Sequence, residues 1–469
     1  MKDWNEECAV VGVYNVKNAT ILSYYALFAM QHRGQEASGI STSDGTKIAT
    51  LKGNGLVTKV FDEENLKKLQ GKSSIGHNRY STAGEDSINE AQPIFARYSL
   101  GEMAIAHNGN LTNAKAVRDM LIQKGAIFQS HLDTENLIHL IAHSQKEHLV
   151  DRIIDALGYV DGAYCFVFLS RSKMFVVRDR YGLRPLSLGK IQNDDGSVGY
   201  IVASETCAFD LVGAEYVRDV SPGEMLIFEG AYTPLSNSEP KSVQVFASIP
   251  KPCVFEYMYF SRPDSQVYGK NVYEIRKQMG RELAREHKLK ADIVIPVPDS
   301  GVAAALGYAK ESGIDFELGI IRNHYVGRTF IEPLQRMREL KVRLKLNPIS
   351  SIIEGKEIIV IDDSVVRGTT SKQIVQILRK AGAKKVYLLI SAPPTISPCY
   401  YGVDTPDKEQ LICANKSIEE VRAYINADFL GFLSIEGMLR SIGGDQEFCK
   451  ACFDGQYVDE YLLQNAKRT

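Results

Sequence analysis

The chain has 469 residues, of which 44% are hydrophobic and 24% are charged, and its formal net charge is −2. This length exceeds one ordinary folding core and predicts two or three domains, while the near-neutral charge gives no reason to expect nucleic acid or an anionic membrane as the main partner. Because no apolar run approaches the roughly 18 residues of a membrane helix, and the polar, acidic residues 1–7 do not resemble a secretory signal, we expect a cytoplasmic protein.

Short alternating apolar runs predict a β-rich first half. Residues 8–14 and 163–169 show the alternation that is typical of strands. A Ser-Pro-Gly-Glu turn at 221–224 precedes what we expect to be the last strand of this half. The polar stretch 233–241 is then typical of a linker, so the first domain is expected over residues 8–235.

The pattern changes in the second half, where continuous apolar runs replace alternating ones. Residues 293–297 and 358–361 have the composition of buried parallel strands, and each leads into a turn of small residues and a helical pattern. The helix after the second strand is predicted over residues 372–381. We therefore expect a doubly wound parallel sheet over residues 236–405, followed by a helical tail over residues 406–469.

The strongest local signal is the stretch Ile-Asp-Asp-Ser-Val-Val-Arg-Gly-Thr-Thr-Ser at 361–371, which follows the second buried strand. Backbone N–H groups and hydroxyls at the start of the next helix can hold a phosphate at the positive helix terminus. The adjacent carboxylates of Asp362 and Asp363 stand where the hydroxyls of a sugar or a Mg²⁺ ion would lie beside that phosphate. Asp-Asp alone is more often an ordinary acidic strand end, but the whole strand–turn–helix pattern favours the phosphate site.

This stretch resembles the motif with which type I phosphoribosyltransferases bind phosphoribosyl pyrophosphate (PRPP). The resemblance implies that Asp362 and Asp363 bind the ribose and Mg²⁺. Asp299 and Ser300, in the Pro-Asp-Ser-Gly turn after the first buried strand, match the pyrophosphate loop of the amidotransferase branch, and Ser300 would join the aspartates around Mg²⁺. The remaining implied PRPP-binding residues of the motif are Ser364, Arg367, Gly368 and the 5′-phosphate cradle of Thr369, Thr370 and Ser371.

A basic segment lies between the two predicted strands. Residues 322–345 hold seven Lys or Arg against two Glu. A solvated basic face is one explanation. A loop that closes over the pyrophosphate leaving group is the other, because that group carries negative charge that must be stabilised. In the family such a loop closes over PRPP, and the resemblance makes Tyr325, near its start, and Lys341 PRPP contacts.

Cys8 lies in an apolar strand, where a lone cysteine is most often a small core residue. No Cys-His-Asn pattern of the papain kind surrounds it. A cysteine at the chain terminus has its own α-amino group as a nearby base, and the pKa of that group, about 8, suits removal of the thiol proton. This interpretation requires that residues 1–7 be absent from the active enzyme.

Four downstream segments support a catalytic role for Cys8. They are His-Arg-Gly-Gln at 32–35, Gly-His-Asn-Arg-Tyr-Ser-Thr at 76–82, His-Asn-Gly-Asn-Leu at 107–111 and His-Leu-Asp-Thr-Glu at 131–135. Each segment is weak alone. Together and in this order they resemble the class II, or N-terminal-nucleophile, glutamine amidotransferases, whose fold is an αββα sandwich.

This second resemblance implies roles that the chemistry of each residue supports. Arg79 can hold the α-carboxylate of glutamine in a bidentate pair, and Asp133 can hold its α-ammonium. The Asn108 side chain and the Gly109 N–H can form the oxyanion hole for the tetrahedral intermediate, since glycine permits a close approach and a positive φ. The histidines of these segments are interpreted as structural.

Seven residues precede Cys8, as in the propeptide-bearing branch of the amidophosphoribosyltransferases, and that branch carries a [4Fe–4S] cluster. Eight cysteines in so long a chain are too sparse for a disulfide framework. Four of them match the cluster pattern of the branch, namely Cys253, Cys399, Cys449 and Cys452. Thiolate ligands suit either iron–sulfur or zinc, and spacing does not separate the two; the resemblance favours the cluster.

Resemblance over essentially the whole chain implies a member of that branch, which uses glutamine to convert PRPP into 5-phosphoribosylamine, the first committed step of purine synthesis. It also implies Mg²⁺ and the cluster as cofactors, purine nucleotides as feedback inhibitors, and a homo-oligomer, a tetramer in the family. Another class II amidotransferase would lack the 361–371 motif, and a PRPP-sensing regulator would need a DNA-binding element. The expected division is a propeptide at 1–7, a glutaminase domain at 8–235, a phosphoribosyltransferase domain at 236–405 and a helical extension at 406–469.

Overall fold

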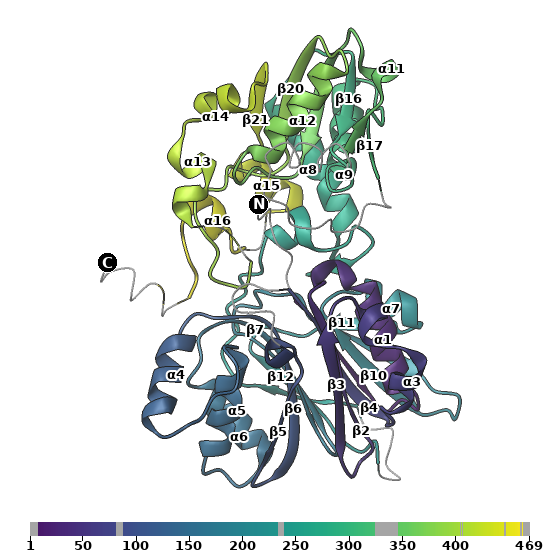
Figure 1. Cartoon of the computed structure of the whole chain (residues 1–469), viewed down its shortest axis with the longest axis vertical. Coiled ribbons are helices and arrows are strands. Elements are labelled where there is room, and N and C mark those ends of the chain that lie inside the picture. Colours follow the sequence, from purple (N-terminus) through teal and green to yellow (C-terminus); the bar gives the residue numbers. More distant parts are fainter. Residues whose placement is uncertain are drawn as a thin grey trace.

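The structure of the chain is a computed structural model with two halves, which lie one above the other in Figure 1. It describes residues 8–80, 88–232, 239–323, 346–403, 405, 407–444, 447–459 and 462. The expected propeptide and the expected PRPP contacts Tyr325 and Lys341 lie outside the described residues.

The first half is a sandwich of two antiparallel sheets. Strand β1 (Ala9–Tyr14) is buried along its whole length, because both of its faces are covered. Val11 and Val13 belong to the apolar cluster beneath helix α1 (Ala19–Ala29), whereas Val10 points into the cluster between the two sheets. Successive side chains of a strand point to opposite faces, so one apolar run contributes to two cores.

The seven-stranded sheet carries α1 and α7 (Cys207–Val212) on its outer face. In spatial order its strands are β11 (Glu215–Asp219), β9 (Ser187–Gln192), β10 (Val198–Ala203), β1, β4 (Ser73–Arg79), β2 (Ala37–Ser43) and β3 (Ile48–Asn54). Three short elements lie on connections within this sheet, namely η1 (Gln31–Arg33), α2 (Val57–Val60) and α3 (Glu63–Lys67), whereas η2 (Ile88–Glu90) leads from β4 to the other sheet.

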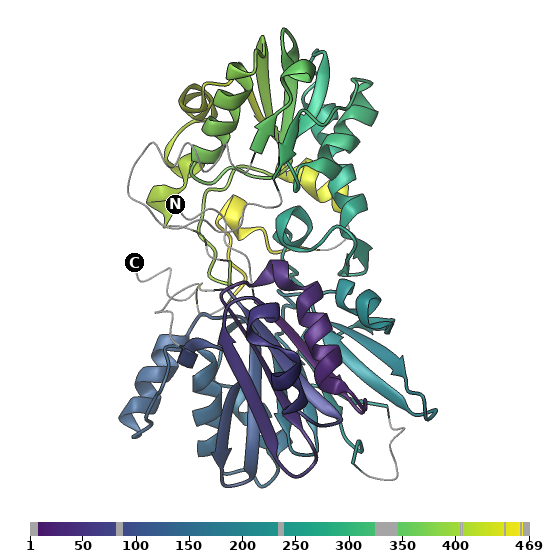
Figure 2. The ribbon, with the colours of Figure 1, turned by 45° about the vertical axis from the view of Figure 1, so that its right-hand side comes forward.

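The six-stranded sheet packs against the first sheet and is covered on its other face by three helices. In spatial order its strands are β13 (Lys241–Gln244), β12 (Glu224–Phe228), β8 (Met174–Arg178), β7 (Gly162–Ser170), β6 (Gly101–Leu111) and β5 (Ile94–Tyr98). The helices are α4 (Ala114–Gln123), α5 (Thr134–His143) and α6 (Leu149–Leu157). This αββα layering confirms the predicted sandwich (Figure 2).

The second half is built on a four-stranded sheet in which all neighbouring strands are parallel. Its order is β16 (Ile293–Pro296), β19 (Glu357–Asp362), β20 (Lys385–Ile390) and β21 (Phe429–Phe432). The principal helices around it are α8 (Val272–Glu286), α9 (Val302–Ser312), α12 (Thr369–Lys380), α14 (Ile418–Ile425) and α15 (Ile435–Ile442). Among the described residues no helix has both the length and the apolar character needed to span a bilayer.

The shorter elements of the second half connect or flank this sheet. They are η3 (Glu256–Phe260), β14 (Gln266–Val267), β15 (Lys270–Asn271), β17 (Ile320–Arg322), β18 (Leu346–Pro348), α11 (Ser350–Ile353), η4 (Lys408–Gln410), α13 (Ile412–Asn415) and α16 (Ala451–Asp454). Of these, η3 is a single turn of π-helix.

Two expected boundaries are corrected by strand pairing. Strand β13 lies beyond residue 235, yet it pairs with β12 and so extends the sandwich to Gln244. Strand β21 lies in the expected helical extension, yet it pairs with β20 and belongs to the parallel sheet. Both strands depend on partners that local composition does not identify.

The start of helix α12 is also corrected. It begins at Thr369 rather than at 372, so Thr369, Thr370 and Ser371 of the motif form its first turn.

Helices α8 and α9 pack closely because a glycine lies at each contact. A Cβ at Gly280 would meet the carbonyl oxygen of Ala304 at 1.9 Å, and one at Gly307 would meet that of Lys277 at 2.0 Å. We expect Gly280→Ala to lower the free energy of unfolding by about 2 kcal/mol, because overpacking outweighs the better helix propensity of alanine. Denaturant unfolding measures this. The control Gly158→Ala, whose Cβ would meet only the oxygen of Asp155 at 3.2 Å, should be nearly neutral.

Two candidate active sites and a cysteine-lined cavity

Cys8 lies at the start of β1, beside the end of β4. The register pairs Ala9 with Asn78, which places Cys8 next to Arg79 and Tyr80. The Cys8 thiol donates to the carbonyl oxygen of Tyr80 at 3.9 Å, and the side chain is partly exposed. Position at a strand end with partial exposure suits a nucleophile better than a core residue. The structure therefore brings together Cys8 and Arg79, as the sequence predicts.

Asn108 and Gly109 lie on β6 of the facing sheet, and Ser204 links them to the strand that follows Cys8. The Ser204 hydroxyl accepts from the Val10 N–H at 3.0 Å and from Asn108 Nδ2 at 3.3 Å. Ser204 was missed by the sequence analysis, because a serine after a strand carries no distinguishing signal.

Gly109 occupies a backbone conformation that only glycine adopts readily. Its φ is +143°, and an added Cβ would meet the carbonyl oxygen of Ala163 at 2.1 Å. The same residue packs against the second half, since a Cβ at Gly402 would lie 3.3 Å from Gly109 Cα. Glycine at position 109 is therefore required both by this backbone conformation and by the close contact with Ala163.

Asp133 stands at the start of α5 and faces the end of β6. Its carboxylate accepts from the Leu111 N–H at 2.9 Å and pairs with His107 Nδ1 at 3.3 Å. Burial raises the pKa of Asp133. The positive charge of His107 and the hydrogen bonds from His107, Leu111 and Thr134 lower it by more, so the net pKa lies below its usual value. An ionised carboxylate at this place can bind a cation such as an α-ammonium group.

Asp362 and Asp363 lie where β19 ends, and the loop after β16 packs against them. The Val297 N–H donates to the Ile361 carbonyl oxygen at 2.8 Å. Asp363 accepts hydrogen bonds from the side chains of Ser300 and Ser364. Parallel strands end at the same edge, so the two predicted segments meet here. Carboxylates and hydroxyls are the hard oxygen ligands that Mg²⁺ prefers, so these residues fit that ion.

The hydroxyl residues of the motif form the first turn of α12. Gly368, which precedes them, has a φ of +71°. The N-terminus of this helix and the Thr369–Ser371 hydroxyls are suited to an anion. Arg367 instead donates to Gln410 Oε1 at 2.8 Å, and Asp299 pairs with Arg322 at 2.8 Å, so in this structure both make contacts within the protein.

The four predicted cluster cysteines line one apolar cavity together with Phe255, Tyr401, Val403 and Ala451. They come from segments far apart in sequence, and Cys253 and Cys449 form an isolated β-bridge. All eight cysteines are free thiols. Burial raises the pKa of Cys452 well above its usual value, and the charges of the other three cysteines raise it further.

The side chains around this cavity suit a group held by sulfur. Among the described residues no three His, Cys, Asp or Glu side chains converge tightly enough to hold a single metal ion. The Tyr401 N–H donates to Cys399 Sγ at 3.3 Å, a contact of the kind that stabilises ligating thiolates. Four thiols around an apolar cavity with such a donor fit an iron–sulfur cluster.

Comparisons with known proteins agree with these sites. A glutamine amidotransferase domain family matches residues 77–210. An amidophosphoribosyltransferase of Bacillus subtilis is 48% identical over 468 residues, which cover 98% of this chain and 96% of that protein.

Two solved structures are similar over nearly the whole chain. The B. subtilis glutamine PRPP amidotransferase complexed with ADP and GMP is 46% identical with a TM-score of 0.90, and the match covers 97% of this chain and 98% of that one. A structure described as the allosteric regulatory enzyme of purine biosynthesis is 47% identical with a TM-score of 0.91, over 97% and 96%. The fold and sites define a glutamine amidotransferase joined to a phosphoribosyltransferase. The chain belongs to the amidophosphoribosyltransferase family.

His77 links the two sheets near Cys8 and gives rise to a testable pH dependence. It is buried, contacts the His107 carbonyl oxygen at 3.0 Å, and has its pKa lowered from 6.5 to about 3, mainly because burial disfavours its charged form. The unfolded chain therefore binds one more proton than the native state between these values, so acidification destabilises the fold.

We expect this histidine to contribute a loss of about 1 kcal/mol in unfolding free energy per pH unit below about pH 6. His77→Gln should remove that contribution and flatten the dependence, as measured by denaturant unfolding between about pH 6 and pH 5. The exposed His143→Gln serves as the control and should keep the parent slope. An unchanged slope in His77→Gln would contradict the assignment.

Proposed function

We propose that this chain hydrolyses glutamine at Cys8 and transfers the ammonia to C1 of PRPP, giving 5-phosphoribosylamine, glutamate and pyrophosphate. The observation that carries the proposal is the presence of two candidate half-sites in one chain: Cys8 lies beside Arg79 at the ends of paired strands, and Asp363 accepts a hydrogen bond from Ser300. The chain is similar to an amidophosphoribosyltransferase and to a solved structure described as an enzyme of purine biosynthesis. This similarity supports the proposal that the chain catalyses the first committed step of purine synthesis.

In the glutamine site, the Cys8 thiolate attacks the side-chain amide carbon of glutamine and forms a thioester. The Asn108 side chain and the Gly109 N–H stabilise the oxyanion, and Arg79 and Asp133 hold the α-carboxylate and the α-ammonium. The amide nitrogen takes a proton and leaves as ammonia, after which water hydrolyses the thioester to glutamate. The base is the α-amino group of Cys8 itself, so residues 1–7 act as a propeptide that must be removed.

In the phosphoribosyl site, Asp362 and Asp363 would bind the ribose hydroxyls and, with Ser300, would hold a Mg²⁺ ion, which would neutralise charge on the pyrophosphate. Thr369–Ser371 and the α12 N-terminus hold the 5′-phosphate. Ammonia reaches C1 through an internal passage, the C1–O bond to pyrophosphate breaks, and the new C–N bond forms. Tyr325 and Lys341 remain proposed PRPP contacts.

Three further properties are proposed, of which only the first is supported by the description of a relative. The B. subtilis structure was solved with ADP and GMP, and the phosphate-binding turn at the α12 N-terminus is suited to nucleotides as well as to PRPP. Purine nucleotides would therefore inhibit at or beside the PRPP site. We also propose a homo-oligomer, a tetramer, in the cytoplasm.

The two half-reactions can be separated by substitution. We expect Cys8→Ala to reduce glutamine-dependent synthesis at least a thousandfold, because no other nucleophile replaces the thiolate, while synthesis from free ammonium persists. Asp363→Asn is the matched variant of the other site and should reduce both activities. Steady-state assays of phosphoribosylamine formation with glutamine or with ammonium measure these effects.

Two outcomes would contradict this assignment. Loss of ammonium-dependent synthesis in folded Cys8→Ala would mean that the half-sites are not separable. A purified chain that still begins at Met1, by mass spectrometry, and retains full glutamine-dependent activity would exclude the terminal-amine mechanism.

We also propose a [4Fe–4S] cluster held by Cys253, Cys399, Cys449 and Cys452. Protein prepared without oxygen should contain iron and acid-labile sulfide at about four of each per chain, the content of such a cluster. Cys449→Ser should lower both and destabilise the fold. Cys413→Ser is the control, because Cys413 does not line the cavity, and it should retain full iron. Zinc, or no metal, in the parent protein would contradict the cluster.

A further inference from the structure

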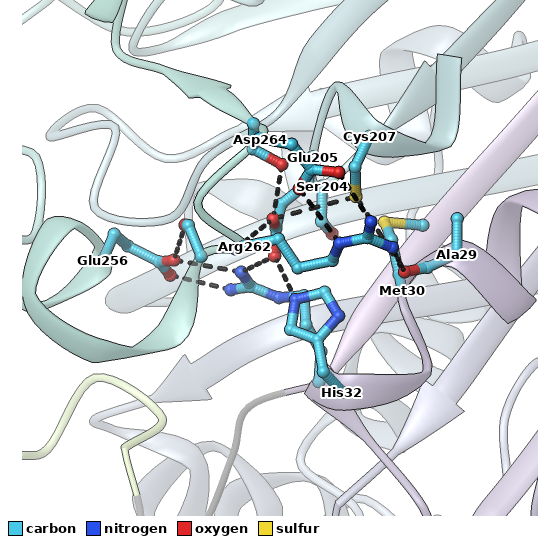
Figure 3. A network of polar contacts seen from close by, with 12 residues as sticks. Ala29, Met30, His32, Ser204, Glu205, Cys207, Glu256, Arg262 and Asp264 are labelled. Carbon is cyan, nitrogen blue, oxygen red and sulfur yellow. Dashed lines mark hydrogen bonds and ion pairs between the residues drawn. The ribbon is translucent and has the colours of Figure 1, made fainter. Parts of the chain in front are cut away.

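A buried group of charges joins the two halves close to Cys8. Arg33, Arg184, Glu205 and Glu256 make up this junction cluster, and each is at most 1% exposed. Arg33 Nη1 lies 2.6 Å from Glu205 Oε1, and Arg33 Nη2 lies 2.7 Å from Glu256 Oε1. Arg184 Nη1 contacts the same Glu256 oxygen at 3.4 Å. Figure 3 labels Glu256 and Glu205, which come from different parts of the chain.

The four residues come from both halves of the chain. Arg33 ends η1 and Glu205 follows β10, so both belong to the glutamine half. Glu256 begins the π-helical turn η3 of the phosphoribosyl half. Two cations and two anions thus meet in a site without water access, where a charge is stable only if it is paired and hydrogen-bonded.

Arg33 also contacts the nucleophilic residue directly. Its Nε donates to the carbonyl oxygen of Cys8 at 3.4 Å. The guanidinium is planar and rigid, so the carboxylates that hold its Nη atoms also set the direction of its Nε. Glu205 is in turn held by His32 Nε2 at 2.7 Å and by the Arg262 N–H at 2.8 Å. A chain of contacts therefore runs from Glu256 through Arg33 to Cys8.

Glu256 is itself held firmly on the phosphoribosyl half. The Ser261 hydroxyl donates to Glu256 Oε2 at 2.6 Å. The buried Arg276 of α8 fastens the same turn, because its Nε donates to the Tyr257 carbonyl oxygen at 2.7 Å and its Nη2 to that of Ser261 at 2.8 Å. The turn that presents Glu256 is thus part of the core of the second half.

We propose that Glu256 is a positioning residue for the glutamine reaction: although it belongs to the phosphoribosyl half, it orients Arg33 and through it the main chain of Cys8. The glutamine site is then complete only when the second half is docked on it. The inference rests on the proposed role of Cys8 as nucleophile, and it adds a residue that is not among the proposed glutamine- or PRPP-binding residues.

Glu256→Gln tests this role, because it retains size but removes an acceptor and the negative charge. The amide can accept through one oxygen only, and its NH₂ would face an arginine donor. Misplacement of a reacting group by about 1 Å can reduce the rate about 10²-fold. We expect kcat for glutamine-dependent synthesis to fall about 10- to 100-fold with KM for glutamine nearly unchanged, because Arg79 and Asp133 are untouched. Ammonium-dependent synthesis should stay within about twofold of the parent.

Alkylation of Cys8 gives a second, direct readout. The rate of inactivation by iodoacetamide, followed as loss of glutamine use, should change by a similar factor in Glu256→Gln. Ser261→Ala removes one hydrogen bond to Glu256 and leaves every charge in place, so it supplies a milder variant if Glu256→Gln does not fold. It should reduce glutamine-dependent kcat a few-fold. Asp264→Asn is the matched control, since Asp264 pairs with Arg262 at the exposed edge of the same network, and it should match the parent.

Two results would overturn the proposal. One is an unchanged glutamine-dependent kcat in folded Glu256→Gln and Ser261→Ala. The other is an equal fall of glutamine- and ammonium-dependent rates, which would mark Glu256 as merely structural. Cys8→Ala distinguishes a failure of the positioning role from a failure of the proposed function. If Cys8→Ala still uses glutamine, the Cys8 mechanism itself is wrong. If it does not, either of the two results above contradicts only the positioning role of Glu256.

Discussion

The buried ion pair between Arg33 and Glu256 is the interaction on which the relation of the two halves depends. Each charge loses its hydration at the junction, and this cost is offset only when several partners are present in good geometry. Glu205 and Arg184 supply the further charges that the pair needs. A small shift between the halves would leave a buried charge unpaired, which costs more than the loss of a comparable apolar contact. The junction therefore specifies one way of docking.

The segments that line the cysteine cavity also contact the glutamine half. The Cys253 N–H donates to the Leu183 carbonyl oxygen at 3.1 Å, and Asn110 Nδ2 donates to that of Tyr400 at 2.9 Å. The loop after Cys399 thus packs on the end of β6, where the proposed oxyanion hole lies. A cluster in this cavity would act structurally, by holding that loop, and would take no part in either half-reaction.

Local patterns predicted the strand content of the two halves well and their boundaries poorly. Strand periodicity predicted a β-rich first half and the composition of buried strands predicted the parallel sheet, because both are properties of short segments, whereas the αββα layering was implied by the resemblance to the class II amidotransferases. The sandwich nevertheless extends to β13, and β21 completes the parallel sheet, because each of these strands is stabilised by a neighbour across the sheet. The N–H and C=O groups at a strand edge can pair with any segment that the fold places beside it. The local sequence of these four-residue strands does not identify that partner.

The sequence by itself determined which residues could do chemistry: the 361–371 motif, the cysteine with its four accompanying segments, and four further cysteines. Each of these signals consists of particular residue types in a particular order along the chain, and resemblance to known families implied its role. Only the tertiary structure decided that Ser204 ties Asn108 to the strand of Cys8, and that Glu256 reaches Arg33 from the other half. These contacts join residues 96 and 223 positions apart. A lone serine or glutamate has no sequence signal for such a contact, because burial and pairing arise only when distant segments pack.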